Sequence, residues 1–377
     1  MSLNLEEKSL PEVDRCIQTA LREKVFSGAA CLASIRGKIF HRHVYGCLED
    51  PPPLKKLKYD DLFDLASLSK PLGAGLVALH LAGRGRLDLG ATIHGSLPIF
   101  SDDRFKAVTI DMLLDHTTGW PADADFWKHC SEQSNPSEAI KLMVKELPLV
   151  ATPGTRVCYS DVGFMVLGWI LEKIVNQPLD VYFYQTFLRP LELDEDLFFV
   201  RQSDFKQKRN LVKRRFVATE DCPLRGKRLV GEVHDPKAWL LDGVAGHAGL
   251  FGTIDGVWKL SEVLRKSWNG EDSFFHSGTV RRFWTRSNRP RNTTRTLAWD
   301  TPDARDSTVG NVVSRNTVGH LGFTGTSIWF DPSTELTMIL LTNAVHPSPE
   351  GKRDRMRKFR VRAHELISKA AASVVSL

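Results

Sequence analysis

The sequence has few cysteines and no long apolar run. Its six cysteines are scattered over 377 residues and never form a C-x-x-C pair, so neither a zinc ribbon nor a dithiol redox site is indicated. The histidines contain no H-E-x-x-H pattern, and we expect no metal or other cofactor. No stretch reaches the roughly eighteen apolar residues of a membrane span. The first residues include acidic side chains and no apolar signal segment, so we expect a cytoplasmic protein with reduced thiols.

Basic residues outnumber acidic ones, but not in the pattern of a nucleic-acid-binding protein. The 51 basic and 45 acidic residues give a net charge of +6, with much of the excess in residues 201–228 and 352–362. Apart from Phe359, no aromatic side chain lies among the arginines of the second segment. We interpret both segments as solvated surface. A small-molecule substrate is therefore expected, without nucleic acid, and the oligomeric state stays open.

Regular structure is predicted in an order that favours one antiparallel sheet built from both chain ends. Apolar runs with the period of a strand occur near each end, and helical runs lie between them. This order is typical of an α+β fold, in which helices flank the sheet and a mostly helical region is inserted. We expect a discontinuous α/β sandwich domain of residues 1–87 and 245–377, a helical domain of 88–244, and an active site in the crevice between them. Strands are predicted at 30–35, 38–46, 317–320, 327–330 and 336–343, and helices at 9–26, 109–115, 137–147, 160–176, 257–267 and 351–370.

The first candidate site is the pair Ser67 and Lys70, which precedes an apolar helical run. Residues three apart share a helix face, so the hydroxyl and the amine can touch. A buried lysine with a lowered pKa can act as the base that a serine nucleophile needs. The start of the helix adds positive potential where an oxyanion would form. The alternative is a helix-capping serine followed by a surface lysine. A second S-x-x-K match, Ser203 to Lys206, lies in a polar, basic stretch with no apolar run after it.

The second candidate site is Tyr159-Ser160-Asp161, which follows a Pro-Gly turn and precedes an apolar run. A tyrosine near the Lys70 ammonium is favoured as phenolate, so it can take the Ser67 proton and return it to the leaving group. Asp161 can hold Lys70 in its charged form. The alternative is that Tyr159 is a packed aromatic and Asp161 a helix cap.

The third candidate site is His320-Leu321-Gly322-Phe323, at the expected edge of the sheet. Glycine lets a substrate carbonyl approach the strand closely. The amide of Phe323 can pair with that of Ser67 to form an oxyanion hole. His320 can donate a hydrogen bond to the substrate or to Tyr159, and its alternative is a structural histidine.

These three sites, in this order and rough spacing, resemble the serine β-lactamase and penicillin-binding-protein superfamily. The resemblance spans about residues 25–345 and is strongest to the class C-like branch, which also holds esterases, D-stereospecific peptidases and amidases. Residues 113–119, LLDHTTG, are similar to that branch's L-L-x-H-T-S-G-L segment. The resemblance implies a β-lactamase/transpeptidase-like fold and a serine hydrolase that works through an acyl-enzyme.

Two positions depart from the usual pattern of that superfamily. Asp161 stands where asparagine is usual, and a carboxylate only accepts hydrogen bonds. His320 stands where a lysine is usual, which removes a permanent cation. Both departures favour an esterase or amidase over a β-lactamase.

A finer resemblance is carried by residues 218–222, 231–236, 243–251 and 342–347. They are similar to the subgroup that contains exo-acting N-acetylmuramoyl-L-alanine amidases of cell-wall recycling. This resemblance implies that His234, Asp235 and His247 are pocket residues, although a structural role is equally open. It implies an amide or ester of a muramoyl-peptide fragment as substrate. The alternatives are a general carboxylesterase, a β-lactamase or D,D-carboxypeptidase, and a non-catalytic binding protein.

Overall fold

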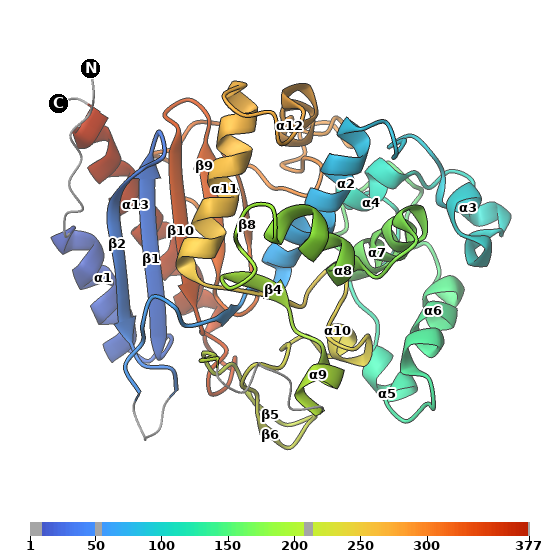
Figure 1. Cartoon of the computed structure of the whole chain (residues 1–377), viewed down its shortest axis with the longest axis horizontal. Coiled ribbons are helices and arrows are strands. Elements are labelled where there is room, and N and C mark those ends of the chain that lie inside the picture. Colours follow the sequence, from blue (N-terminus) through green and yellow to red (C-terminus); the bar gives the residue numbers. More distant parts are fainter. Residues whose placement is uncertain (1–9, 50–54, 207–213, 376–377) are drawn as a thin grey trace.

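The fold consists of a five-stranded sheet with helices on both faces, beside a mostly helical region (Figure 1). It is seen in a computed structural model that describes residues 10–49, 55–206 and 214–375. The sheet lies at the left of Figure 1, and its strands come from both ends of the chain. The predicted α+β class, with an antiparallel sheet from both chain ends and an inserted helical region, is confirmed.

The main sheet has the order β2-β1-β10-β9-β8, and all its neighbours are antiparallel. Strand β1 pairs with β10 along its length, from Ala29 opposite Thr342 to Ile35 opposite Leu336. Each predicted strand is present within about two residues. The strands are β1 (Gly28–Ile35), β2 (Lys38–Gly46), β8 (Val318–Leu321), β9 (Ser327–Asp331) and β10 (Leu336–Thr342).

Strand β1 is buried along its whole length because helices cover both faces of the sheet. Successive strand side chains point to opposite faces. Ala29, Cys31 and Ala33 pack in one apolar cluster with helices α1 and α13, whereas Ala30 and Leu32 pack in the other large cluster. Helix α11 contacts β1 and β10 in addition. The covering helices are α1 (Pro11–Arg22), α11 (Ile254–Asn269), α12 (Ser277–Trp284) and α13 (Arg353–Val375).

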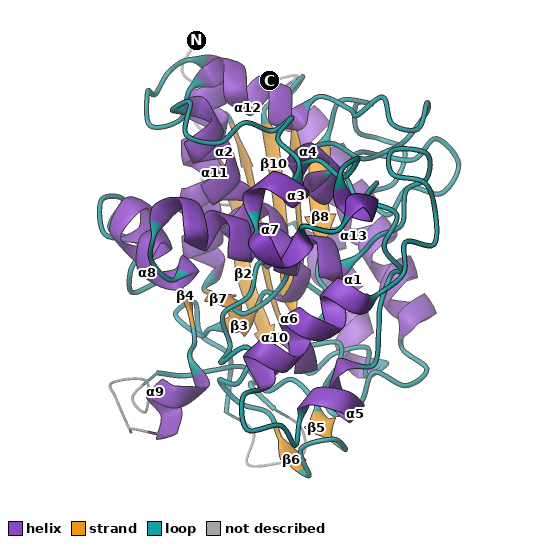
Figure 2. Cartoon of the chain, turned by 90° about the vertical axis from the view of Figure 1, so that its right-hand side faces the viewer, coloured by secondary structure: helices purple, strands orange, loops and turns teal. Residues whose placement is uncertain are grey.

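The second region is built around helix α7 (Asp161–Val175), whose first ten residues are almost all buried. Figure 2 shows α6, α7 and α10 in front of the strands of the main sheet. Across the described residues, none of the helices combines the length and the apolar character needed to cross a bilayer. The other helices of this region are α3 (Ile93–Ser96), α4 (Ile110–Leu114), α5 (Phe126–Cys130), α6 (Pro136–Glu146), α8 (Leu179–Phe183), α9 (Gln202–Lys206) and α10 (Pro236–Leu240), and β5 (Asp221–Cys222) pairs with β6 (Lys227–Arg228).

A second sheet of three very short strands was not predicted from the sequence. In it, β7 (Leu250–Gly252) pairs with β3 (Phe63–Asp64) and with β4 (Leu197–Phe199). Two or three residues are too few to leave a recognisable alternation of apolar and polar side chains. This sheet matters for the site because β3 leads directly into the Ser67 turn and β7 follows His247. The domain boundaries at residues 87/88 and 244/245 stay a prediction.

Candidate active site

Ser67 lies in a tight turn rather than in the first turn of a regular α-helix. A 3₁₀ turn (Ala66–Leu68) is followed by a π-helical turn (Lys70–Ala74) and then by α2 (Gly75–Gly83). Pro71 has no backbone N–H, so an α-helical bond from residue 71 back to the Ser67 carbonyl cannot form. The helix instead closes through the wider bond from the Gly75 amide to the Lys70 carbonyl. The predicted single helix is therefore three kinds of helix in succession.

The residue before the nucleophile candidate is held in an unfavourable conformation by a buried carboxylate. Ala66 has a φ of +48°, a left-handed value that costs an alanine about 1 kcal/mol. The Asp64 carboxylate accepts the Ala66 amide at 2.8 Å and the His234 amide at 2.6 Å. Burial raises the pKa of Asp64, although these two amides act in the opposite direction. Asp64 therefore joins the Ser67 turn to the segment that carries His234.

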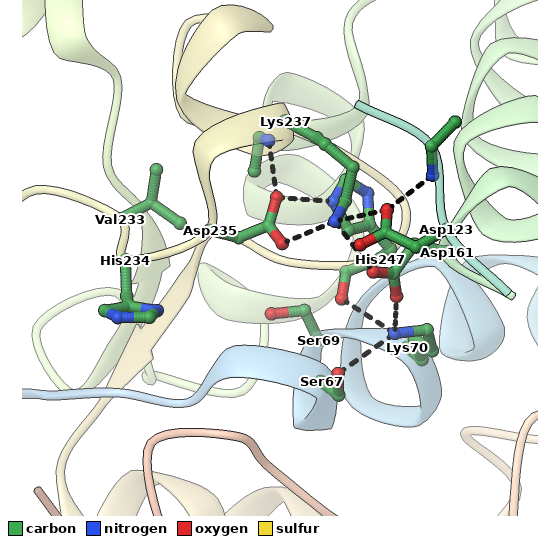
Figure 3. A network of polar contacts seen from close by, with 12 residues as sticks. Ser67, Ser69, Lys70, Asp123, Asp161, Val233, His234, Asp235, Lys237 and His247 are labelled. Carbon is green, nitrogen blue, oxygen red and sulfur yellow. Dashed lines mark hydrogen bonds and ion pairs between the residues drawn. The ribbon is translucent and has the colours of Figure 1, made fainter. Parts of the chain in front are cut away.

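The Lys70 ammonium lies among several hydrogen-bond acceptors, and one of them is Ser67 Oγ (Figure 3). Nζ lies 3.0 Å from Ser67 Oγ, 2.7 Å from Asp161 Oδ1 and 3.4 Å from the carbonyl oxygen of His247. The side chain is fully buried. These acceptors hold the buried amine against the serine hydroxyl.

The pKa of Lys70 is raised, which corrects the expectation of a lowered value. Burial acts to lower this pKa, but the charges of Asp161 and Tyr159 and their hydrogen bonds raise it by more. The sequence could not show that the carboxylate outweighs desolvation. A lysine that is already an ammonium cannot accept the Ser67 proton, so another group must act as the base.

A second lysine, Lys237, extends this network, and sequence analysis missed it. Its Nζ lies 3.2 Å from Asp161, 3.2 Å from Asp123 and 3.4 Å from Asp235 (Figure 3). Burial lowers the pKa of Lys237, but these carboxylates raise it above its usual value. Asp161 thus lies between two ammonium groups. That arrangement offsets the negative charge which distinguishes it from the asparagine usual at this position.

Asp235 and His247 form the outer part of the same network. His247 Nε2 lies 2.9 Å from Asp235 Oδ1, and Asp235 also caps α10 by accepting the Ala238 amide. Ligand atoms of Asp161, Asp235 and His247 come within 4.8 Å of one another, a grouping that could hold a metal ion. The Lys237 ammonium already contacts both carboxylates and supplies positive charge there. The His247 ring is buried, which favours a supporting role behind Lys70 over direct substrate contact.

Tyr159 lies against two cations and a histidine. Lys70 Nζ is 4.8 Å from the centre of its ring, and the Arg295 guanidinium carbon is 5.2 Å from it. The His116 ring centre is 4.5 Å from that of Tyr159. Burial, Arg295 and Lys70 keep the pKa of His116 well below its usual value, and Nδ1 accepts the Ser160 amide. His116 is therefore neutral with its proton on Nε2. Arg295 carried no signal in the sequence, because no motif or helix face singles it out.

In His320 the ring nitrogen Nε2 is an acceptor rather than a donor. Its Nδ1 lies 2.9 Å from the Leu321 carbonyl, so the proton of the neutral ring is on Nδ1. Burial, Lys70 and Arg295 keep the pKa of His320 well below its usual value. The buried Nε2 has no hydrogen-bond partner among the described residues, and the ring centre lies 6.0 Å from that of Tyr159. The expected direction of its hydrogen bond is therefore reversed.

The turn from Gly322 to Thr326 is fixed from two sides. The hydroxyls of Thr324 and Thr326 donate to the carbonyls of Asp64 and Leu65 at 2.8 and 3.0 Å. From α13, the partly buried Arg360 donates to the carbonyls of Gly322 and Thr326 at 2.6 and 2.9 Å. A Cβ atom at Gly322 would lie 2.0 Å from Thr326 Oγ1, so only glycine fits. The turn that carries the Phe323 amide is therefore tied to the segment that carries the Ser67 amide.

The two other candidates from the sequence, Ser203 and His234, form no hydrogen bond with Ser67 or Lys70 among the described residues. Ser203 donates its hydroxyl and its amide to Asp242 at 2.9 Å each. The side chain of Lys206 lies outside the described residues, so the second S-x-x-K pair is not described as a pair. His234 stacks on Phe323 and lies 2.9 Å from Glu220 through Nε2.

Comparison with known proteins identifies the family. The beta-lactamase family model matches residues 13–363, nearly the whole chain. The chain belongs to the beta-lactamase family. Within it, the chain is 33% identical over 367 residues to an N-acetylmuramyl-L-alanine amidase of Bacillus subtilis (strain 168), covering 90% of this chain and 82% of that protein. It is 31% identical over 303 residues to a putative D-alanyl-D-alanine carboxypeptidase of Salmonella agona (strain SL483), covering 76% of this chain and 70% of that protein.

Solved structures of the beta-lactamase type share the fold. A class C beta-lactamase superposes with a TM-score of 0.72 at 16% identity, covering 98% of this chain and 100% of that one. A hydrolase with promiscuous acyltransferase activity superposes with a TM-score of 0.71 at 21% identity, covering 93% and 98%. The predicted β-lactamase/transpeptidase-like fold is confirmed, and the protein is a serine hydrolase of this family.

Acid should remove stability through Asp161. Burial acts to raise its pKa, but Lys70, His247 and Lys237 lower it to about 2, against 3.8 ordinarily. A lowered folded-state pKa stabilises the protein above pH 3.8, and this stabilisation is lost as the pH falls toward 2. At about 1.4 kcal/mol per pKa unit, the loss is of the order of 2 kcal/mol.

Urea unfolding at several pH values between 5 and 2.5 tests this expectation. The Asp161→Asn variant cannot titrate at this position and should lose less stability over that range than the wild type does. Asp60→Asn, at an exposed position, is the control. Parallel curves for the wild type and Asp161→Asn would contradict the low pKa.

Proposed function

We propose that this protein is an amidase that forms an acyl-enzyme at Ser67 and cleaves the lactyl–alanine amide of muramoyl-peptide fragments. The observation that carries the chemistry is the buried Lys70 ammonium, which donates to Ser67 Oγ while paired with Asp161. The substrate class is supported by the 33% identity to an N-acetylmuramyl-L-alanine amidase.

The proposed reaction starts with proton transfer from Ser67 to Tyr159. Because the Lys70 ammonium donates to Ser67 Oγ, the serine proton is left to point elsewhere, and Lys70 itself cannot take it. Negative charge that develops on the Tyr159 oxygen is stabilised by the two cations that lie against its ring. Tyr159 is therefore the proposed base.

The attack of Ser67 on the carbonyl carbon forms a tetrahedral oxyanion. The amides of Ser67 and Phe323 are the proposed donors to it, because the two segments that carry them are tied together by Thr324 and Thr326. Tyr159 then protonates the leaving amine, and a water molecule activated by Tyr159 releases the acid. Asp161, His320 and Gly322 line the proposed substrate site, with His320 accepting a hydrogen bond through Nε2.

The other activities fit this site less well. His320 is neutral, so it lacks the cation that engages a substrate carboxylate in β-lactamases and transpeptidases. A general carboxylesterase is the second candidate, because Ser67, Lys70 and the turn that carries the Phe323 amide would serve an ester in the same way. A D,D-carboxypeptidase is favoured only by the 31% identity to a putative one. A non-catalytic binding protein is disfavoured because Ser67, Lys70 and Tyr159 are all present. Action in the cytoplasm stays a prediction.

A parallel assay tests the proposed function. N-acetylmuramoyl-L-alanine, a p-nitrophenyl ester and nitrocefin are compared by kcat/KM on the same preparation. We expect N-acetylmuramoyl-L-alanine to be cleaved best, with release of free alanine. Turnover of nitrocefin far above the others would overturn the amidase, and turnover of the ester alone would favour the carboxylesterase. Ser67→Ala is the control for contaminating hydrolases.

A further inference from the structure

The most exposed large hydrophobic side chain in the described residues is Phe323, with 66% of its surface accessible. Isolated exposed hydrophobics need no explanation. Phe323 differs because the turn that carries it is held from both sides, by Thr324 and Thr326 toward β3 and by Arg360 from α13. Because the turn is already rigid, binding a ligand to the exposed ring costs little additional conformational entropy.

The ring of Phe323 is also supported from behind. His234 stacks on it with ring centres 5.6 Å apart and an interplanar angle of 29°. His234 is fixed in turn, through its amide to Asp64 at 2.6 Å and through Nε2 to Glu220 at 2.9 Å. Arg225 donates to the carbonyls of Val233 and His234 at 2.7 and 3.0 Å. One side of the Phe323 ring therefore rests on a fixed imidazole, and much of the rest faces solvent.

The part of a substrate that contacts the Phe323 side chain can be inferred from the proposed reaction. The Phe323 amide is a proposed donor to the oxyanion, so the carbonyl carbon of a bound substrate, and the groups that this carbon carries, lie within one residue's reach of the Phe323 side chain. Tyr159, the proposed acid for the leaving amine, belongs to a different segment at the start of α7. A group carried by the acyl carbon is therefore within reach of the exposed Phe323 ring.

We propose that the exposed face of Phe323 binds the pyranose ring of the acyl group by stacking. This inference rests on the proposed function, because in a muramoyl amide the acyl group carries a sugar. A pyranose has an apolar C–H face that suits an aromatic ring, and hydroxyl edges that suit polar neighbours. Here the neighbours are the His234 imidazole and the Glu220 carboxylate. A fatty acyl chain would instead need an apolar channel, and the Glu220 carboxylate that contacts the supporting His234 disfavours that.

The kinetic test compares two amides that differ only in the sugar. N-acetylmuramoyl-L-alanine carries it, and lactoyl-L-alanine has the same scissile bond without it. Phe323→Ala should lower kcat/KM roughly tenfold more for the first than for the second, the scale of one aromatic stacking contact. Phe323→Trp should retain the sugar-bearing activity. Leu142→Ala, at another exposed apolar position, should change neither. Equal losses of kcat/KM on both substrates would overturn the proposal. Phe323 would then act only through its backbone amide in the oxyanion hole.

A binding measurement separates this inference from the proposed function. Saturation-transfer NMR with methyl N-acetyl-β-glucosaminide is recorded on Ser67→Ala protein, with and without Phe323→Ala. Loss of the transfer signal on addition of Phe323→Ala supports the stacking surface, even if the wild type cleaves no muramoyl amide and the proposed function fails. An unchanged signal would overturn the stacking surface, even if the amidase activity is present.

Discussion

Replacing Ser67 by alanine should abolish hydrolysis of every amide and ester substrate. The hydroxyl oxygen accepts a hydrogen bond from Lys70 Nζ at 3.0 Å, and without the hydroxyl no acyl-enzyme can form. In serine hydrolases the loss of the nucleophile costs about 10⁴- to 10⁶-fold in kcat. Covalent labelling by a fluorophosphonate, followed by intact mass, measures the same loss without a choice of substrate.

The matched control for this variant is Ser203→Ala. Ser203 opens the other S-x-x-K sequence, but its hydroxyl donates to Asp242. Its replacement should leave labelling and turnover unchanged. Labelling that persists in Ser67→Ala and disappears in Ser203→Ala would move the nucleophile to the second sequence and refute the site described above.

Replacing Lys70 by methionine should have the second-largest effect. Methionine has a similar length but no charge, so it removes the ammonium from Ser67 and from Asp161 together. We expect a loss of about 10³-fold or more in kcat, because the serine hydroxyl loses its cation and charge on Tyr159 loses one of its two cations. Breaking a buried ion pair costs about 3 kcal/mol, and the remaining Lys237 should reduce that cost.

Lys237→Met tests whether charge balance alone explains such a loss. Lys237 also pairs with Asp161, at 3.2 Å, but no contact joins it to Ser67 among the described residues. The Lys237→Met variant should lose about as much stability as Lys70→Met does, and far less activity. Stability is read from urea unfolding, and activity from kcat of the p-nitrophenyl ester. Equal activity losses in the two variants would mean that Lys70 acts only by balancing Asp161.

Local sequence patterns predicted the main sheet and the contact between Ser67 and Lys70. The strands near both ends and the helix after Ser67 could be predicted because periodicity is a local property. Ser67 and Lys70 are three residues apart, so a helical segment predicts their contact, and the contact is present although 3₁₀ and π turns replace the expected α-helix. Tyr159, Asp161 and His320 were found through the order of three motifs rather than through any one of them.

What the sequence did not predict depends on contacts between distant segments. Lys237 reaches Asp161 from another helix, and nothing in its own neighbourhood indicates a buried ammonium. The proton position on His320 is set by the carbonyl of the next residue, which only the backbone conformation reveals. The pKa of Lys70 depends on whether burial or a carboxylate 91 positions away in the chain prevails.

The pairing of the first strand with the last has a consequence for biosynthesis. Strand β1 is made early, whereas its partner β10 and helix α13, which supplies Arg360, are made after the rest of the sheet. Until then the Gly322–Thr326 turn lacks both the neighbouring strand β10 and the hydrogen bonds from Arg360. A growing or prematurely terminated chain is thus expected to contain Ser67 and Lys70 without a competent catalytic centre, so hydrolysis begins only when synthesis of this region has ended.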